Sequence, residues 1–338
     1  MNEIVFNSAL APYMHAYMKE YATKGFNCYR HAFPLMQFDR YLTRSGYDKD
    51  FITETAYHGW TEWLNGHRDS TKYEYSTVVV SFIKYLTEMG HPCYIPRLPK
   101  FHESDFVPYV FTPEEMEKIF KACDEWRDRR HTVRNLAIIM PALLRLLYST
   151  GMRVGEAVSI RNRDVDFERH VITLYHTKNG HERLAPLNES MEAVLKQYIH
   201  YRNKMPLPHV ADPDSFLFTS PQGRRSQHSC SIWQRFNSIL RDAGIPYQGG
   251  HHGPRVHDLR HTACVHSLVN MVWAGKDPYC CLPLLSTFMG HIHVTDTEHY
   301  LRLTQNMYPE IIKLDEIVTS PIKEIICNTV NTIGDEND

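Results

Sequence analysis

Residues 91–111 interrupt an otherwise periodic chain, and this break limits the folds that the chain can adopt. The segment shows neither helical nor strand periodicity and contains four prolines, Pro92, Pro96, Pro99 and Pro108. Proline lacks a backbone donor and disfavours helix at the preceding residue, so such a segment is typical of an extended connector. We therefore expect two domains joined by residues 91–111, for which 338 residues are sufficient.

Residues 1–90 predict a small helical domain. Helical periodicity is found in four stretches, at about 6–22, 29–44, 53–65 and 71–89. Each stretch is followed by a glycine, namely Gly25, Gly46, Gly66 and Gly90. Glycine readily adopts the left-handed conformation that ends helices, so this pattern indicates a four-helix domain.

A helix-start signal at residue 112 opens a second domain. Thr112 can cap the first turn, Pro113 suits the first helical position, and Glu114 is favourable near a helix N-terminus. Further helical patterns follow at about 132–149, shortly after Gly151, and at about 189–203, 229–243, 257–273, 280–288 and 296–303. We assign residues 112–315 to this domain and residues 316–338 to a C-terminal tail.

Two alternating runs, at 170–175 and 183–187, predict the only strands. The dipeptide Asn179-Gly180 between them is typical of a tight hairpin turn. The expected fold class is therefore mainly α with a small antiparallel β-sheet.

Composition excludes several classes of protein. An apolar content of 43% with 22% charged residues is typical of a soluble globular protein. No stretch approaches the roughly 18 apolar residues of a membrane span, and the N-terminus lacks a secretory signal pattern, so we expect a cytoplasmic protein without membrane contact. The eight cysteines include no Cys-x-x-Cys pair, which argues against a disulfide framework or a zinc ribbon.

Charge gives little indication of the partner. The formal net charge is −2, although affinity for nucleic acid usually depends on Lys and Arg that neutralise phosphates. Residues 112–315 carry 25 Lys and Arg against 22 Asp and Glu. This small excess of positive charge forms a basic patch only if folding brings the charged residues together.

Two segments place cations beside turns. Arg153 follows Thr150-Gly151-Met152 at an expected helix start, with Glu156 three residues later. Alone, this would be a surface pair worth a few tenths of a kcal/mol. Lys178 lies at the expected hairpin tip, where a lysine usually only aids solubility.

The segment from His257 to His261 is more informative. On a helix, His257, Arg260 and His261 share one face. Burial of such a cationic cluster is costly without an anionic partner. Two histidines four residues apart could also bind zinc, but Arg260 on the same face would repel a metal, and Asp258 stands where a metalloprotease has its catalytic Glu.

A last segment places Gly290 and His291 nine residues before Tyr300. The whole set resembles, in type, order and spacing, the active site of the tyrosine recombinases, the family of lambda integrase; the set is Arg153, Lys178, His257, Arg260, His291 and Tyr300.

The resemblance extends through about 200 residues. Thr150 to Glu156 supply the family's Thr-Gly-x-Arg-x-x-Glu, and the strand after Lys178 supplies Ala185-Pro186-Leu187. His257 to His261 match His-x-Leu-Arg-His, and Thr297 stands where the family usually has threonine. One departure is the segment 292–296, which is more polar and richer in histidine than is usual.

The resemblance implies a domain arrangement. Residues 1–90 are expected to be the family's core-binding domain, which is SAM-like, and residues 112–315 its catalytic domain. The two domains would then clamp DNA between them.

The chemistry of phosphodiester cleavage fits these residues. The negative phosphate oxygens repel a nucleophile, and Arg153 and Arg260 are always charged and present forked donors to them. Tyr300 needs help, because at pH 7 only about one tyrosine in a thousand with an ordinary pKa is ionised.

By resemblance, each residue has a role. Tyr300 is the nucleophile that forms a 3′-phosphotyrosyl link, His257 helps to accept its proton, and Lys178 protonates the leaving 5′ oxygen. His291 hydrogen-bonds to the scissile phosphate, while Glu156 and His261 are supporting residues. No cofactor or metal is implied.

The resemblance implies a site-specific recombinase that acts on double-stranded DNA as a homotetramer through a four-way junction. The apolar run 322–326 in the tail is a candidate for docking on a neighbouring protomer. Whether accessory directionality proteins are needed stays open. The alternatives are a type IB topoisomerase, a regulatory DNA-binding protein and a zinc hydrolase built on His257 and His261.

Overall fold

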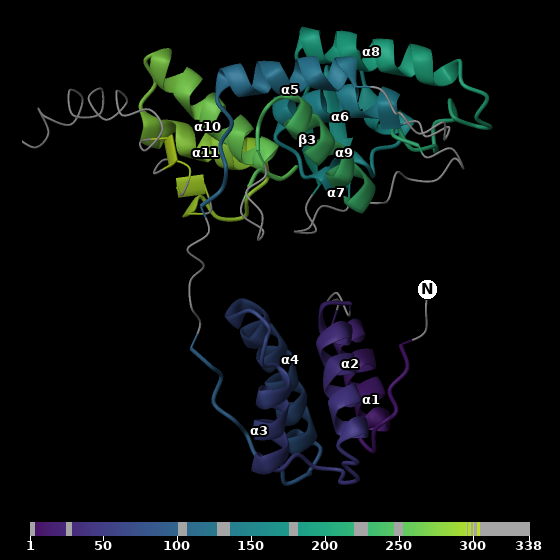
Figure 1. The fold of residues 1–338 in the computed structure, drawn as a ribbon, viewed down its shortest axis with the longest axis vertical. Coiled ribbons are helices and arrows are strands. Elements are labelled where there is room, and N and C mark those ends of the chain that lie inside the picture. The colour runs from purple at the N-terminus through teal and green to yellow at the C-terminus, as the bar shows by residue number, and fades with distance from the viewer. Residues whose placement is uncertain are drawn as a thin grey trace, which may run out of the picture. The chain divides into compact units, whose positions relative to one another are not determined.

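The computed structural model describes residues 4–24, 29–100, 107–126, 136–175, 182–219, 229–246, 253–295, 297–298, 300 and 303–304. The chain divides into two compact units, Met1–Phe106 and Val107–Asp338 (Figure 1). In the described part of the chain, no helix has both the length and the apolarity to cross a membrane.

The first unit consists of four described helices, α1 (Ala11–Thr23), α2 (Tyr29–Arg44), α3 (Glu54–Trp63) and α4 (Asp69–Glu88). Their apolar faces enclose one core in which Trp60, Phe38 and Phe82 are fully buried. Helix α2 packs against the other three. The four helices expected from the sequence are therefore confirmed.

The first helix begins later than residue 6, where the pattern placed it. The carboxylate of Asp39 on α2 accepts hydrogen bonds from the backbone N–H groups of Asn7 and Ser8. This interaction holds the chain in a non-helical conformation, and α1 starts at Ala11. A contact with a distant residue thus overrides the local pattern.

The second unit is mainly helical. Its longer helices are α5 (Pro113–Glu125), α6 (Leu136–Thr150), α8 (Glu189–Asn203), α9 (Ser229–Asp242), α10 (Asp258–Trp273) and α11 (Pro278–Met289). Helix α6 lies at the centre and packs against α5, α8 and α10. Its leucines Leu143, Leu144 and Leu146 are fully buried. These positions agree with the sequence patterns to within a few residues.

A small antiparallel sheet completes this unit. Strand β2 (Val171–Leu174) pairs with β3 (Arg183–Pro186), and Ile172 lies opposite Ala185. A third strand, β1 (Val165–Asp166), pairs with β2 and was not expected. It has only two residues and follows a single 3₁₀ turn, η1 (Asn162–Asp164), so it shows no alternation.

Several expected features lie outside the described residues. These are the hairpin tip with Lys178 and Asn179-Gly180, the start of the helix expected at 132–149, and the tail at 316–338 with its apolar run. At the described positions of the helix expected at 296–303, the backbone is helical, including at Tyr300.

Candidate active site

Arg153 stands at the start of the four-residue helix α7 (Val154–Ala157). The carboxylate of Glu156 accepts hydrogen bonds from the backbone N–H of Arg153 at 3.0 Å and from its Nη1 at 2.9 Å. Burial alone would raise the pKa of Glu156, but these bonds and the nearby guanidinium of Arg183 outweigh it and lower the pKa. The pair is thus a partly buried ion pair, in which the carboxylate is buried, unlike the surface pair that the motif alone suggests.

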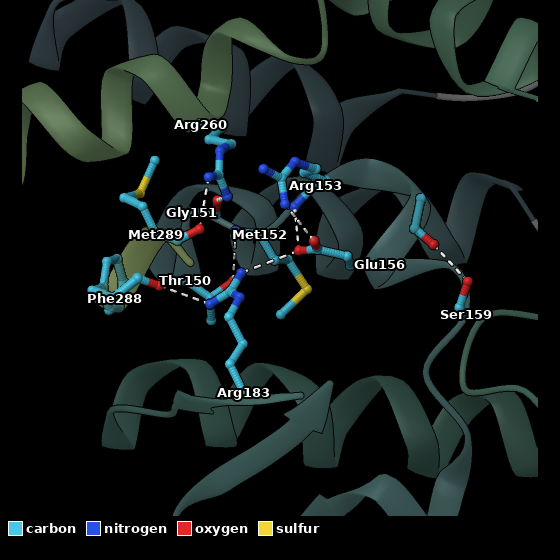
Figure 2. Close-up of polar contacts among 11 residues, drawn as sticks. Thr150, Gly151, Met152, Arg153, Glu156, Ser159, Arg183, Arg260, Phe288 and Met289 are labelled. Carbon is cyan, nitrogen blue, oxygen red and sulfur yellow. Dashed lines mark hydrogen bonds and ion pairs between the residues drawn. The ribbon is translucent and has the colours of Figure 1, made fainter. Parts of the chain in front are cut away.

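Arg260 projects from α10 and joins two turns (Figure 2). Its Nη1 donates to the carbonyl of Gly151 at 2.5 Å, and its Nη2 donates to the carbonyl of Met289 at 2.7 Å. Only 3% of Arg260 is exposed. Burial, followed by the charge of Arg153, lowers the pKa of Arg260 to about 10, so the guanidinium remains charged at neutral pH.

Gly151 makes this close approach of the two turns possible. Its φ of +58° lies in the left-handed region, and a Cβ there would lie 2.7 Å from Sδ of Met289. Glycine at this position therefore favours the close approach of the end of α6 to the end of α11.

Arg183, which sequence reasoning did not select, joins the same group. Its Nη2 donates to Glu156 Oε2 at 3.1 Å, and its Nη1 donates to the carbonyl of Phe288 at 2.7 Å. Figure 2 shows Glu156 held between Arg153 and Arg183. The sequence signal that could have identified Arg183 is its position at the start of a strand. By the alternation of that strand, its side chain points inward.

Tyr300 contacts two of the predicted histidines. Its hydroxyl lies 2.8 Å from Nδ1 of His261. The ring of His291 is nearly parallel to the ring of Tyr300, with centroids 6.1 Å apart, and Nδ1 of His291 lies 2.8 Å from Oγ1 of Thr297. His257 adjoins His261, with its ring centroid 4.9 Å from that of His261.

The environment of Tyr300 opposes ionisation. Only 4% of the residue is exposed, and burial raises its pKa, while the positive charges of Arg260 and Arg153 have a smaller opposite effect. Deprotonation of this hydroxyl therefore needs an acceptor in contact with it, and Nδ1 of His261 lies at hydrogen-bond distance.

A cleft of about 940 Å³ opens beside Arg153 and His257. Its lining extends to Arg161 and Arg163, both of which interact with Asp214. The cleft is thus lined by three arginines together with the carboxylates of Glu156 and Asp164.

The structure brings eight predicted or newly found residues together from α7, β3 and α10, the caps of α7 and α10, and the segment after α11, whereas Lys178 lies outside the described part. Among the residues described, no group of three or more His, Cys, Asp or Glu side chains has a metal-binding arrangement.

Comparison with known proteins gives the family context. The model of the phage integrase family matches residues 109–307. Among curated relatives, the putative integrase/recombinase y4rB of Sinorhizobium fredii is 34% identical over 206 residues, which cover 61% of this chain and 65% of that protein. The chain thus spans slightly less than two thirds of the length of this relative.

Two solved structures show a similar fold. The first is the XerH site-specific recombinase bound to palindromic difH substrate in a post-cleavage complex, with a TM-score of 0.61 and 18% identity over 86% of this chain and 79% of that chain. The second is a lambda integrase tetramer bound to a Holliday junction, with a TM-score of 0.59 and 15% identity over 86% of this chain and 76% of that chain.

Proposed function

Because the chain belongs to the phage integrase family, we propose that it is a site-specific recombinase that cuts and rejoins DNA strands through Tyr300. The observation that carries the proposal is the contact of the Tyr300 hydroxyl with His261, within the influence of the charges of Arg260 and Arg153. A nucleophile, a proton acceptor and two phosphate-binding cations are thereby combined in one site.

The two arginines neutralise the scissile phosphate. Arg153 lines the cleft, while Arg260 is anchored to backbone carbonyls through one N–H of each terminal nitrogen. A guanidinium has five N–H donors, so these two bonds do not use all the donors of Arg260. By analogy with arginine fingers, such contacts are worth roughly 10³–10⁵ in rate.

The histidines and Lys178 handle the protons. His261 accepts the proton of Tyr300 by direct contact, and Asp258, whose Oδ1 lies 4.0 Å from Nε2 of His261, stabilises the imidazolium that forms. His257 assists from the cleft side. Lys178 protonates the departing 5′ oxygen, and His291 donates to a phosphate oxygen.

The cleavage step conserves the energy of the phosphodiester bond. The phenolate of Tyr300 attacks phosphorus, the bond to the 5′ oxygen breaks, and a 3′-phosphotyrosyl link and a 5′-hydroxyl result. The 5′-hydroxyl of a second strand then reverses the attack without any external energy source.

We propose that four protomers carry out this exchange on two DNA sites through a four-way junction. The support is the fold shared with a lambda integrase that was solved as a tetramer on a Holliday junction. The mobilised DNA would be an integrating element.

The test is covalent trapping on a nicked suicide substrate that carries the DNA flanking the gene. The wild-type protein should form a covalent adduct in the presence of EDTA, and Tyr300→Phe should bind the same DNA without forming it. An adduct that persists in Tyr300→Phe would overturn the assignment and direct attention to Tyr279, which is exposed on α11.

A further inference from the structure

Arg183 is a largely buried cation that the catalytic roles above do not use. It begins β3, and only 11% of its side chain is exposed. Its guanidinium forms one bond to the carboxylate of Glu156 and one to the backbone carbonyl of Phe288 (Figure 2). A buried charge is costly to desolvate, and these two partners offset part of that cost for Arg183.

The first partner, Glu156, connects Arg183 to Arg153. Glu156 accepts from Arg183 through Oε2 and from Arg153 through Oε1. The same carboxylate also caps the backbone N–H of Arg153. Because one planar carboxylate binds both guanidinium groups, the position of Arg183 determines where Arg153 enters the cleft.

The second partner, the carbonyl of Phe288, connects Arg183 to the turn that carries His291. Helix α11 ends at Met289, where the last carbonyls have no partner within the helix and attract cations. Arg183 binds the carbonyl of Phe288, and Arg260 binds the carbonyl of Met289. Two arginines therefore fix consecutive carbonyls directly before the Gly290-His291 turn.

Gly290 shows how closely Arg183 contacts this turn. A Cβ at position 290 would lie 2.6 Å from Cδ and 2.7 Å from Nε of Arg183. The arginine stem thus lies directly on the glycine backbone, and any displacement of one moves the other.

We propose that Arg183 is a positioning residue that sets Arg153 and His291 at a fixed spacing so that both reach the same scissile phosphate. It acts through Glu156 and the carbonyl of Phe288 and does not itself touch DNA. This inference rests on the recombinase function proposed above. A displacement of about 1 Å of a catalytic group can lower a rate by about 10²-fold, so loss of this link should affect cleavage strongly.

The test measures single-turnover cleavage of the suicide substrate together with DNA affinity. Arg183→Lys retains the buried charge but replaces the planar fork by a single ammonium, and Arg183→Met removes the charge. Both variants should cleave roughly 10²-fold more slowly at saturating protein, with the Kd for DNA within about twofold of the wild type.

A matched control is available in the same unit. Arg145 on α6 likewise binds one carboxylate, that of Asp124, and one backbone carbonyl, that of Pro141. Arg145→Met should leave the cleavage rate unchanged. Glu156→Gln should slow cleavage, and combining it with Arg183→Met should add little further loss, because both changes break the same link.

Three outcomes would overturn the inference. They are cleavage at the wild-type rate by both Arg183 variants, a loss of DNA affinity that accounts for the whole defect, and unfolding of both variants, which would make Arg183 a purely structural residue. If the wild-type protein forms no covalent adduct, the proposed recombinase function fails instead, so the two failures are distinguishable.

Discussion

At the scale of single residues, Tyr300 combines two opposing requirements. Its burial holds the phenol in the neutral form and raises its pKa, whereas attack on phosphorus requires the phenolate. In the proposed mechanism the contact with His261 resolves this conflict, because an imidazole nitrogen 2.8 Å from the hydroxyl can take the proton as the new bond forms. The family resemblance gives His257 a share in accepting this proton, and a spacing along a helix does not show which of two neighbouring rings reaches the hydroxyl.

Removal of the His261 acceptor should therefore slow the chemical step. We expect His261→Phe, which keeps an aromatic ring, to lower the rate of covalent trapping by at least about 10²-fold without weakening DNA binding. The control is His266→Phe on the same helix, because His266 makes an equivalent 2.8 Å contact with the hydroxyl of Tyr148 outside the site. Equal rates for the two variants would exclude a role of His261 in proton transfer.

At the scale of elements, the site depends on short helix ends rather than on long helices. The turn after α6 presents Gly151 and Arg153, the end of α11 presents Met289 and Gly290, and Arg260 of α10 joins them. The long helices were predictable from periodicity; α8, for example, has the expected bounds, because Asn188 caps its start. The importance of Arg183 was not predictable from periodicity, since it arises from two partners that are 27 and 105 residues away in the chain.

Gly290 allows the turn and the strand to be tested together. Gly290→Ala and Gly275→Ala both place a side chain at a positive φ, so each should lose roughly 1–2 kcal/mol of stability. Only Gly290→Ala meets Arg183, whereas no atom lies within 4 Å of a Cβ at position 275. We expect Gly290→Ala alone to lose cleavage, measured as single-turnover trapping at a temperature where both variants are folded. Equal activity of the two variants would show that the spacing between Arg183 and the turn is not critical.

Glu156 predicts a specific dependence of stability on pH. Its pKa is lowered in the folded protein, so the ionised carboxylate stabilises the fold above its unfolded pKa of about 4.3. This contribution is lost as pH falls through the lower folded pKa. The free energies of unfolding of the wild type and Glu156→Gln should therefore differ at pH 7 and converge below about pH 4. Exposed Glu125→Gln serves as the control, and a difference for Glu156→Gln that does not change with pH would contradict the lowered pKa.

At the scale of the whole molecule, two compact units follow one another along the chain, and the family match lies within the second. The ordered set of motifs allowed this membership to be predicted from the sequence, because motif spacing reflects the family's fold. The strand β1 and the start of α1 were missed, since a two-residue strand has no periodicity and the start of α1 depends on Asp39 of another helix. Contacts between elements, rather than the elements themselves, were the part that local patterns could not supply.

In the proposed function, Tyr300 forms the covalent link to DNA. The most direct measurement is to trap the adduct on a suicide substrate, digest protein and DNA, and locate the nucleotide-linked residue by mass spectrometry. We expect a single modified peptide in which Tyr300 carries a 3′-linked nucleotide. A nucleotide on any other residue, or a link through a 5′ phosphate, would contradict it.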